Sequence, residues 1–125
     1  MAKIGIAVIG AGAIATIAHL PSIKKISELE LKAIVDIDAE RASSAASTFE
    51  VASSLTDYHD ALAMKDISAV VVCIPNYLHS KVTIDALEVG KHVLCEKPMA
   101  TNLTDAKRMV QWSHRKKGPH GRIYP

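Results

Sequence analysis

The sequence is poor in cysteine, in aromatic side chains, in net charge and in long apolar runs. Its 125 residues include only Cys73 and Cys95, with no CxxC pair, which argues against a disulfide framework and against a zinc or other metal site. The net charge of +2 is too small to indicate a nucleic-acid partner. No apolar run reaches the about 18–20 residues that a membrane span requires. We therefore expect a globular cytoplasmic protein with reduced thiols and no membrane contact.

Short apolar segments alternate with helical patterns along the chain. Residues 3–9 and 69–74 are apolar or β-branched at almost every position, which predicts parallel strands covered on both faces. Further strands are expected at 31–35, 51–53 and 92–95, each followed by a helix. This alternation is typical of an α/β fold with a Rossmann-type, doubly wound parallel sheet, here of about five strands with flanking helices.

Capping and breaking residues predict where the helices begin and end. Helix starts are expected at Asp38, at Thr56 or Asp57, and at Asn102, which has capping-box spacing to Asp105. Pro21 is expected to end or kink the first helix, and Gly90 to end the helix over 77–89. The last helix is expected to turn Met109 and Val110 inward and to carry basic residues at its end.

The stretch "VIGAGAIA" places a glycine-rich turn between the first strand and the first helix. Gly10 permits a tight turn, Gly12 leaves room for a pyrophosphate, and Ala15 is small enough for close packing of helix on strand. The backbone N–H groups of Ala13 and Ile14 then lie at the positive end of the helix, where anions bind. A dinucleotide site is favoured; a purely structural turn and an S-adenosylmethionine site are the alternatives.

Asp36 ends the second strand, close to the spacing of about 20 residues expected for the acid that binds the adenosine ribose. A carboxylate there accepts hydrogen bonds from both ribose hydroxyls and repels a 2′-phosphate, and Ile37 beside it offers no positive charge. NAD is therefore favoured over NADP, although Arg41 could reach back toward the site. Asp38 is interpreted as a helix cap rather than a ligand.

Later motifs make the pattern specific. The stretches "CIPNYLH" and "GKHVLCEKPMA", in this order after "VIGAGAIA" and "VDIDAERA", resemble the Gfo/Idh/MocA oxidoreductase family, which includes glucose–fructose oxidoreductase and inositol dehydrogenase. The resemblance covers residues 3–117. It implies an NAD(P)-binding Rossmann domain over 1–117, followed by a short basic tail over 118–125. It also implies hydride transfer between nicotinamide and a sugar- or polyol-like hydroxyl or carbonyl compound.

The resemblance also implies roles for individual residues. The segment Ile74, Pro75 and Asn76 is expected to line the nicotinamide-ribose side, although Ile74 stands where the family has threonine. Glu96 is expected to touch the cofactor ribose, and Lys97 to orient or polarise the reacting substrate oxygen. The remaining cofactor-side residues that it implies are His79, which opens the next helix, and Pro98, which sets the turn after Lys97.

Structural interpretations of the same side chains stay open. His79 could be a helix-start histidine with a local partner, and Glu96 and Lys97 could form an exposed ion pair of little energetic value. His19, near the end of the first helix, is expected to be structural. The two cysteines could form a redox pair at the ends of adjacent strands, but two inert, small apolar residues are the favoured interpretation.

Family members carry a second domain that holds the substrate surface, and a sixth strand at the sheet edge. We expect neither in this sequence, since "PHGRIYP" is too short and polar for that strand. The fifth strand would then be an exposed edge, and self-association through that edge or through an uncovered domain face is expected. Catalysis by this chain alone would be weak or absent.

Three hypotheses follow for the function. The chain is the nucleotide-binding part of an NAD-dependent oxidoreductase, a dinucleotide-binding or sensor module without chemistry, or an inactive truncated remnant. The pattern in the sequence favours the first.

Overall fold

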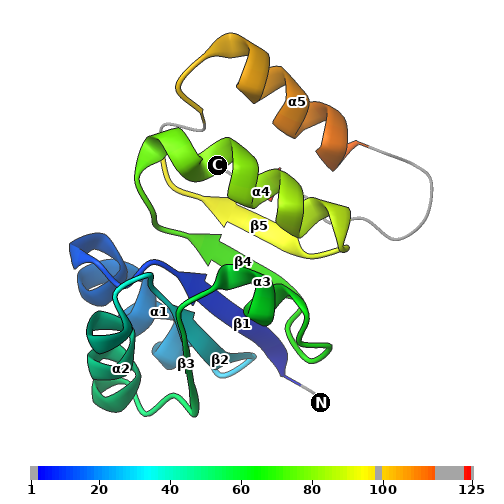
Figure 1. Ribbon diagram of the computed structural model, residues 1–125. Helices are drawn as coiled ribbons and strands as arrows, with labels where there is room; N and C mark the ends of the chain where they lie inside the picture. Colours follow the sequence, from blue (N-terminus) through cyan, green and yellow to red (C-terminus); the bar gives the residue numbers. More distant parts are fainter. Residues whose placement is uncertain (1–2, 98–99, 115–122, 125) are drawn as a thin grey trace.

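The computed structural model describes residues 3–97, 100–114 and 123–124 (Figure 1). The strands are β1 (Ile4–Ile9), β2 (Leu29–Val35), β3 (Ser53–Leu55), β4 (Ala69–Val72), β5 (His92–Cys95) and β6 (Ile123–Tyr124). The helices are η1 (Ala15–His19), α1 (Leu20–Lys25), α2 (Ala39–Thr48), α3 (Tyr58–Leu62), η2 (Asn76–Leu78), α4 (His79–Glu88) and α5 (Leu103–Ser113). None of the helices in these ranges is both long and apolar enough to cross a bilayer.

The strands form one sheet in the order β3-β2-β1-β4-β5-β6, and every neighbouring pair is parallel. The chain moves outward from β1 through β2 to β3, returns to β4 on the other side of β1, and then moves outward again. The predicted doubly wound Rossmann-type fold is thereby confirmed. Ligands bind such sheets at the carboxyl ends of the strands where the winding reverses, here between β1 and β4.

Two apolar clusters bury the two faces of the sheet. Along β1, Ala7 and Ile9 belong to the cluster under α3, α4 and α5, whereas Ile6 and Val8 belong to the cluster under α1 and α2. Figure 1 shows the same division, with α4 beside α5 on one side and α2 on the other. Burial on both faces explains why this strand is apolar at successive positions rather than at alternate ones.

The expected helix caps are confirmed. The Asp38 carboxylate accepts hydrogen bonds from two backbone N–H groups in the first turn of α2. Asp57, rather than Thr56, caps α3 by accepting from a backbone N–H. The Asn102 side chain accepts from the Asp105 N–H at 2.8 Å and donates to the Asp105 carboxylate at 3.0 Å. Each cap satisfies an N–H group that has no carbonyl one turn earlier.

Several expected boundaries are wrong. Pro21 does not end the first helix: it lies in the first turn of α1, directly after the wide turn η1, where the missing N–H is tolerated. The second strand begins at Leu29 and the third lies at Ser53–Leu55, two residues later than expected. Val110 is 43% exposed rather than inward, whereas Met109 is fully buried. The basic residues expected at the end of the last helix lie outside the described residues.

The expectation that no sixth strand is present is also wrong. Ile123 and Tyr124 pair with Val93 and Leu94 as β6, so β5 is not the edge of the sheet over these residues. The strand has only two residues, too few for an alternation pattern in the sequence. Long-range pairing with β5, rather than local propensity, defines it. The rest of the expected tail, residues 118–122 and 125, lies outside the described part of the chain.

Lys91 ties the entrance of β5 to the loop before β4. It is only 9% exposed, and its Nζ donates to the carbonyl oxygens of Met64 at 2.9 Å and Ile67 at 2.5 Å. Burial lowers the pKa of this lysine. We expect Lys91→Met to lower the free energy of unfolding by about 1–3 kcal/mol, because methionine donates to neither carbonyl.

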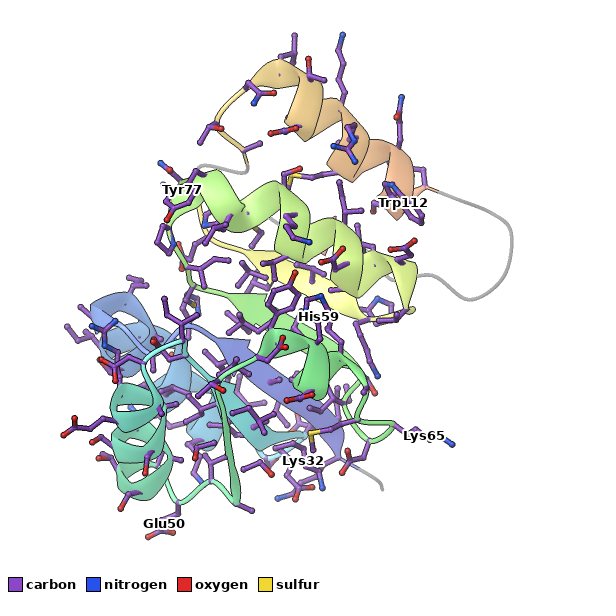
Figure 2. All side chains as sticks on the ribbon, viewed as in Figure 1. Lys32, Glu50, His59, Lys65, Tyr77 and Trp112 are labelled. Atoms are coloured by element: carbon purple, nitrogen blue, oxygen red, sulfur yellow. The ribbon has the colours of Figure 1, made fainter. Side chains whose placement is uncertain are left out.

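Chemical denaturation followed by circular dichroism measures this effect. Lys65→Met is the matched control, since Lys65 extends into solvent from the same loop (Figure 2). The control is expected to change stability by no more than about 0.5 kcal/mol. Equal midpoints for the two variants would show that the Lys91 hydrogen bonds do not stabilise the fold.

Candidate functional site

The glycine-rich turn lies at the carboxyl end of β1, in contact with the end of β4. Gly10 has a φ of +105°, and a Cβ built on it would lie 2.2 Å from the carbonyl oxygen of Cys73. Its N–H donates to the Val35 carbonyl at 2.6 Å, which ties the turn to β2 as well. No residue with a side chain fits here without moving the backbone of the neighbouring strand. The predicted reason for Gly10, a tight turn, is therefore correct.

Gly12 differs from Gly10, because a Cβ on it would have no neighbour within 4 Å. The helix begins at Ala13, so the N–H groups of Gly12, Ala13 and Ile14 precede the first intrahelical hydrogen bonds. Ala15 is fully buried against the sheet, as its small side chain predicts. The turn thus combines open space with backbone donors, which is what a pyrophosphate requires.

Asp36 lies beside this turn and holds it in place. The residue is 8% exposed, its Oδ2 accepts from the Ala11 N–H at 2.9 Å, and its Oδ1 accepts from the Asp38 N–H at 2.9 Å. Arg41 Nη1 lies 3.7 Å from Oδ2. The sequence predicted the position of this acid, but not that its carboxylate also organises the two turns around it.

A shallow groove lies beside Asp36 between η1 and α2, and most of its lining is apolar. Its lining residues are Ala11, Thr16, Arg41, Ser44, Ala45, Thr48 and Phe49. Arg41 is half-exposed and connects this groove with the buried Asp36 carboxylate. Sequence reasoning identified Arg41 only as a residue that could extend toward Asp36. The structure places the Arg41 side chain beside that carboxylate.

A pocket at the carboxyl ends of β4 and β5 brings together most of the residues implied for the nicotinamide side. Its lining residues are Ile14, Cys73, Ile74, Asn76, His79, Glu96 and Lys97. They come from the glycine-rich helix, from the loop before α4 and from the end of β5. Pro75 is exposed within the same loop, and Tyr77 projects beside it (Figure 2). Pro98 lies outside the described residues.

His79 organises this loop from inside the fold. The ring is 1% exposed, and its Nε2 is hydrogen-bonded to the Ile74 carbonyl at 2.8 Å. The bond closes the segment between β4 and α4 and fixes the carbonyl of the first residue in the "IPN" stretch. The structure thus supplies the local partner that the structural interpretation of this histidine expected.

Glu96 pairs with a residue that sequence reasoning did not connect to it. Its Oε1 is hydrogen-bonded to Nε2 of His19, whose side chain comes from η1. Among the ion pairs of residues 3–97 and 100–114, none joins Glu96 to Lys97, and the Lys97 side chain is exposed beside the pocket. The partners are 77 residues apart, so no local pattern could have indicated the contact.

Both cysteines are free, and they pack against opposite faces of the sheet. Cys73 packs against the cluster under α1 and α2, whereas Cys95 belongs to the cluster on the opposite face of the sheet. Burial raises the pKa of Cys73 to about 12 and also raises the pKa of Cys95. Cys95 is therefore a small apolar residue of the core, whereas Cys73 is partly buried and also lines the pocket at the carboxyl ends of β4 and β5. In the described part of the chain, no group of three or more His, Cys, Asp or Glu side chains is placed to hold a metal ion.

Comparison with known proteins places this chain in a protein family. Residues 4–119 match the Gfo/Idh/MocA family, described as an oxidoreductase family with an NAD-binding Rossmann fold. An uncharacterized oxidoreductase from Rhizobium meliloti is 41% identical over 103 residues, which is 82% of this chain and 31% of that protein. The chain spans about a third of the length of the curated relatives that it matches.

Two solved structures show what similar folds bind. Myo-inositol dehydrogenase from Lactobacillus casei, in complex with NAD(H) and myo-inositol, has a TM-score of 0.86 and 31% identity, covering 97% of this chain and 36% of that one. A 3-ketoreductase from Actinomadura kijaniata, in complex with NADP, has a TM-score of 0.83 and 33% identity, covering 88% and 35%. From the family match, the relatives and the shared fold, this chain belongs to the Gfo/Idh/MocA oxidoreductases with an NAD-binding Rossmann fold.

Proposed function

We propose that this chain binds a nicotinamide dinucleotide across the crevice between β1 and β4, as the nucleotide-binding part of an oxidoreductase. The observation that carries the proposal is the open space at Gly12 beside the buried Asp36 carboxylate. The first accommodates a pyrophosphate and the second accepts hydrogen bonds from ribose hydroxyls. The pocket of Ile74, Asn76 and Glu96 lies on the opposite side of the turn and suits the nicotinamide half.

NAD is the preferred cofactor in this proposal. The Asp36 carboxylate repels a 2′-phosphate, and Arg41 is already engaged as its ion-pair partner at 3.7 Å. The similar solved structures differ in cofactor: the inositol dehydrogenase was solved with NAD(H) and the 3-ketoreductase with NADP. The charge at residue 36 is the feature of this chain that favours NAD.

The reaction that fits the family is the interconversion of an alcohol and a carbonyl in a sugar- or polyol-like compound. A bound nicotinamide ring supplies or accepts the hydride. Lys97, exposed beside Asn76 at the pocket, is the residue of this chain that donates a hydrogen bond to the reacting substrate oxygen. Ile14 and Ile74 provide apolar surface that limits water at the same place.

Calorimetric titration with NAD and NADP tests the proposal, and Asp36→Ser tests the basis of selectivity. Wild-type protein is expected to bind NAD more tightly than NADP. Asp36→Ser is expected to weaken NAD binding by about 10–100-fold, since a charge-assisted hydrogen bond is lost, and to reduce the preference for NAD. Asp38→Ser is the matched control, because serine keeps the helix cap, and its NAD affinity should stay within about threefold of wild type.

The outcomes separate the three hypotheses. NAD binding together with turnover of a polyol supports an oxidoreductase, and binding without turnover in the full-length protein supports a non-catalytic module. Absence of binding to either dinucleotide would indicate an inactive remnant and would contradict the proposal. An unchanged NAD/NADP ratio in Asp36→Ser would remove Asp36 as the selectivity residue.

A pair of glycine variants separates folding from binding. Gly12→Ala is expected to change stability by less than about 1 kcal/mol, because the added methyl group meets no protein atom, and to weaken NAD binding at least about tenfold. Gly10→Ala is expected to destabilise the fold by about 3 kcal/mol, because its Cβ would lie 2.2 Å from the Cys73 oxygen. Thermal melts and NAD titration measure both effects. NAD binding by Gly12→Ala at wild-type strength would place the pyrophosphate elsewhere.

We also propose that the chain self-associates through the sheet face that α1 leaves uncovered over β4 and β5. A groove there is lined almost entirely by apolar atoms, and Ile26 and Leu94 at its walls are 43% and 37% exposed. Size-exclusion chromatography with light scattering should give a mass that rises with concentration. Leu94→Lys should restore the monomer, whereas Val89→Lys, at the exposed residue directly after α4, should not. A monomeric mass at every concentration would contradict this proposal.

A further inference from the structure

The glycine-rich helix contains an irregular turn that changes where its side chains point. Residues Ala15–His19 form a π-helical turn, in which the Leu20 N–H bonds to the carbonyl of Ala15 instead of to that of Thr16. A turn of this kind inserts one residue into an α-helix and rotates the following positions by about 100° relative to a regular helix. The following segment, α1, remains packed on the sheet through Leu20 and Ile23.

The turn brings His19 to the carboxylate of Glu96. His19 Nε2 contacts Glu96 Oε1, and the two side chains are 20% and 29% exposed. The contact passes over the end of β4, where burial and the charge of Glu96 raise the pKa of Cys73. It therefore connects the helix that follows β1 with the residue that follows β5, across the point where the winding of the sheet reverses.

The carboxylate held in this way belongs to the nicotinamide-side pocket. Glu96 lines that pocket together with Asn76 and Lys97, while His19 lies outside it, facing the groove over β4 and β5. A carboxylate has about four acceptor positions on its two oxygens. A donor fixed on Oε1 restrains the rotation of the group and leaves Oε2 able to accept from a ligand.

We propose that His19 is a positioning residue for the cofactor: it holds Glu96 so that the carboxylate is oriented toward the nicotinamide ribose. The proposal rests on the proposed function, because it needs a dinucleotide in the crevice. It assigns His19 no contact with the cofactor itself. A merely structural tie between η1 and β5 would stabilise the fold without distinguishing the two halves of the dinucleotide.

Binding of NADH and of AMP distinguishes these roles, since AMP carries only the adenosine and one phosphate. In the full chain, His19→Ala is expected to weaken NADH binding about tenfold and to change AMP binding by less than about twofold. His19→Gln, which keeps a donor at similar reach, should bind NADH within about threefold of wild type. In a Glu96→Ala background, His19→Ala should have no further effect on NADH.

Three outcomes would overturn the positioning role while leaving dinucleotide binding intact. They are equal losses of affinity for NADH and AMP, no loss of affinity for either, and additive effects of His19→Ala and Glu96→Ala. If the wild-type chain binds neither NADH nor AMP, the proposed function and this inference are overturned together. Circular dichroism melts accompany each titration. Should His19→Ala fail to fold, His19→Asn gives the same comparison, because asparagine is polar but too short to reach Glu96.

Discussion

The contact between the Gly10 backbone and the Cys73 carbonyl is the constraint on which the rest of the site depends. With a hypothetical Cβ only 2.2 Å from that oxygen, the end of β1 can lie this close to the end of β4 only as glycine. The close approach sets where the helix after the turn begins and where its N–H groups point. It also keeps β1 and β4 paired up to the point where the winding reverses and a crevice opens.

Around this contact, each loop of the site is held by a hydrogen bond from a side chain that is not fully exposed. Asp36 holds the glycine-rich turn through the Ala11 N–H, and His79 holds the loop before α4 through the Ile74 carbonyl. Glu96 is held by His19. Side chains restrained in this way lose little conformational freedom when a ligand binds, which is the physical basis of a preorganised site.

The two faces of the sheet differ in how fully the described helices cover them. On one face, α3, α4 and α5 bury a continuous apolar cluster that reaches from Ala7 to Met109. On the other face, α1 and α2 cover the side of β1, β2 and β3 and leave an apolar groove over β4 and β5. The pocket lined by Asn76, Glu96 and Lys97 lies at the carboxyl end of these same strands.

Local features of this protein follow from the sequence by itself, whereas contacts between distant segments do not. The apolar runs of β1 and β4 and the caps at Asp38 and Asn102 follow from strand periodicity and local hydrogen bonding, and the sequence predicted them correctly. The sixth strand and the His19–Glu96 contact are decided by the tertiary structure. So is the placement of the cysteines on opposite faces. The physical reason is that these features depend on which segments become neighbours in the fold. Local patterns in the sequence do not determine that order.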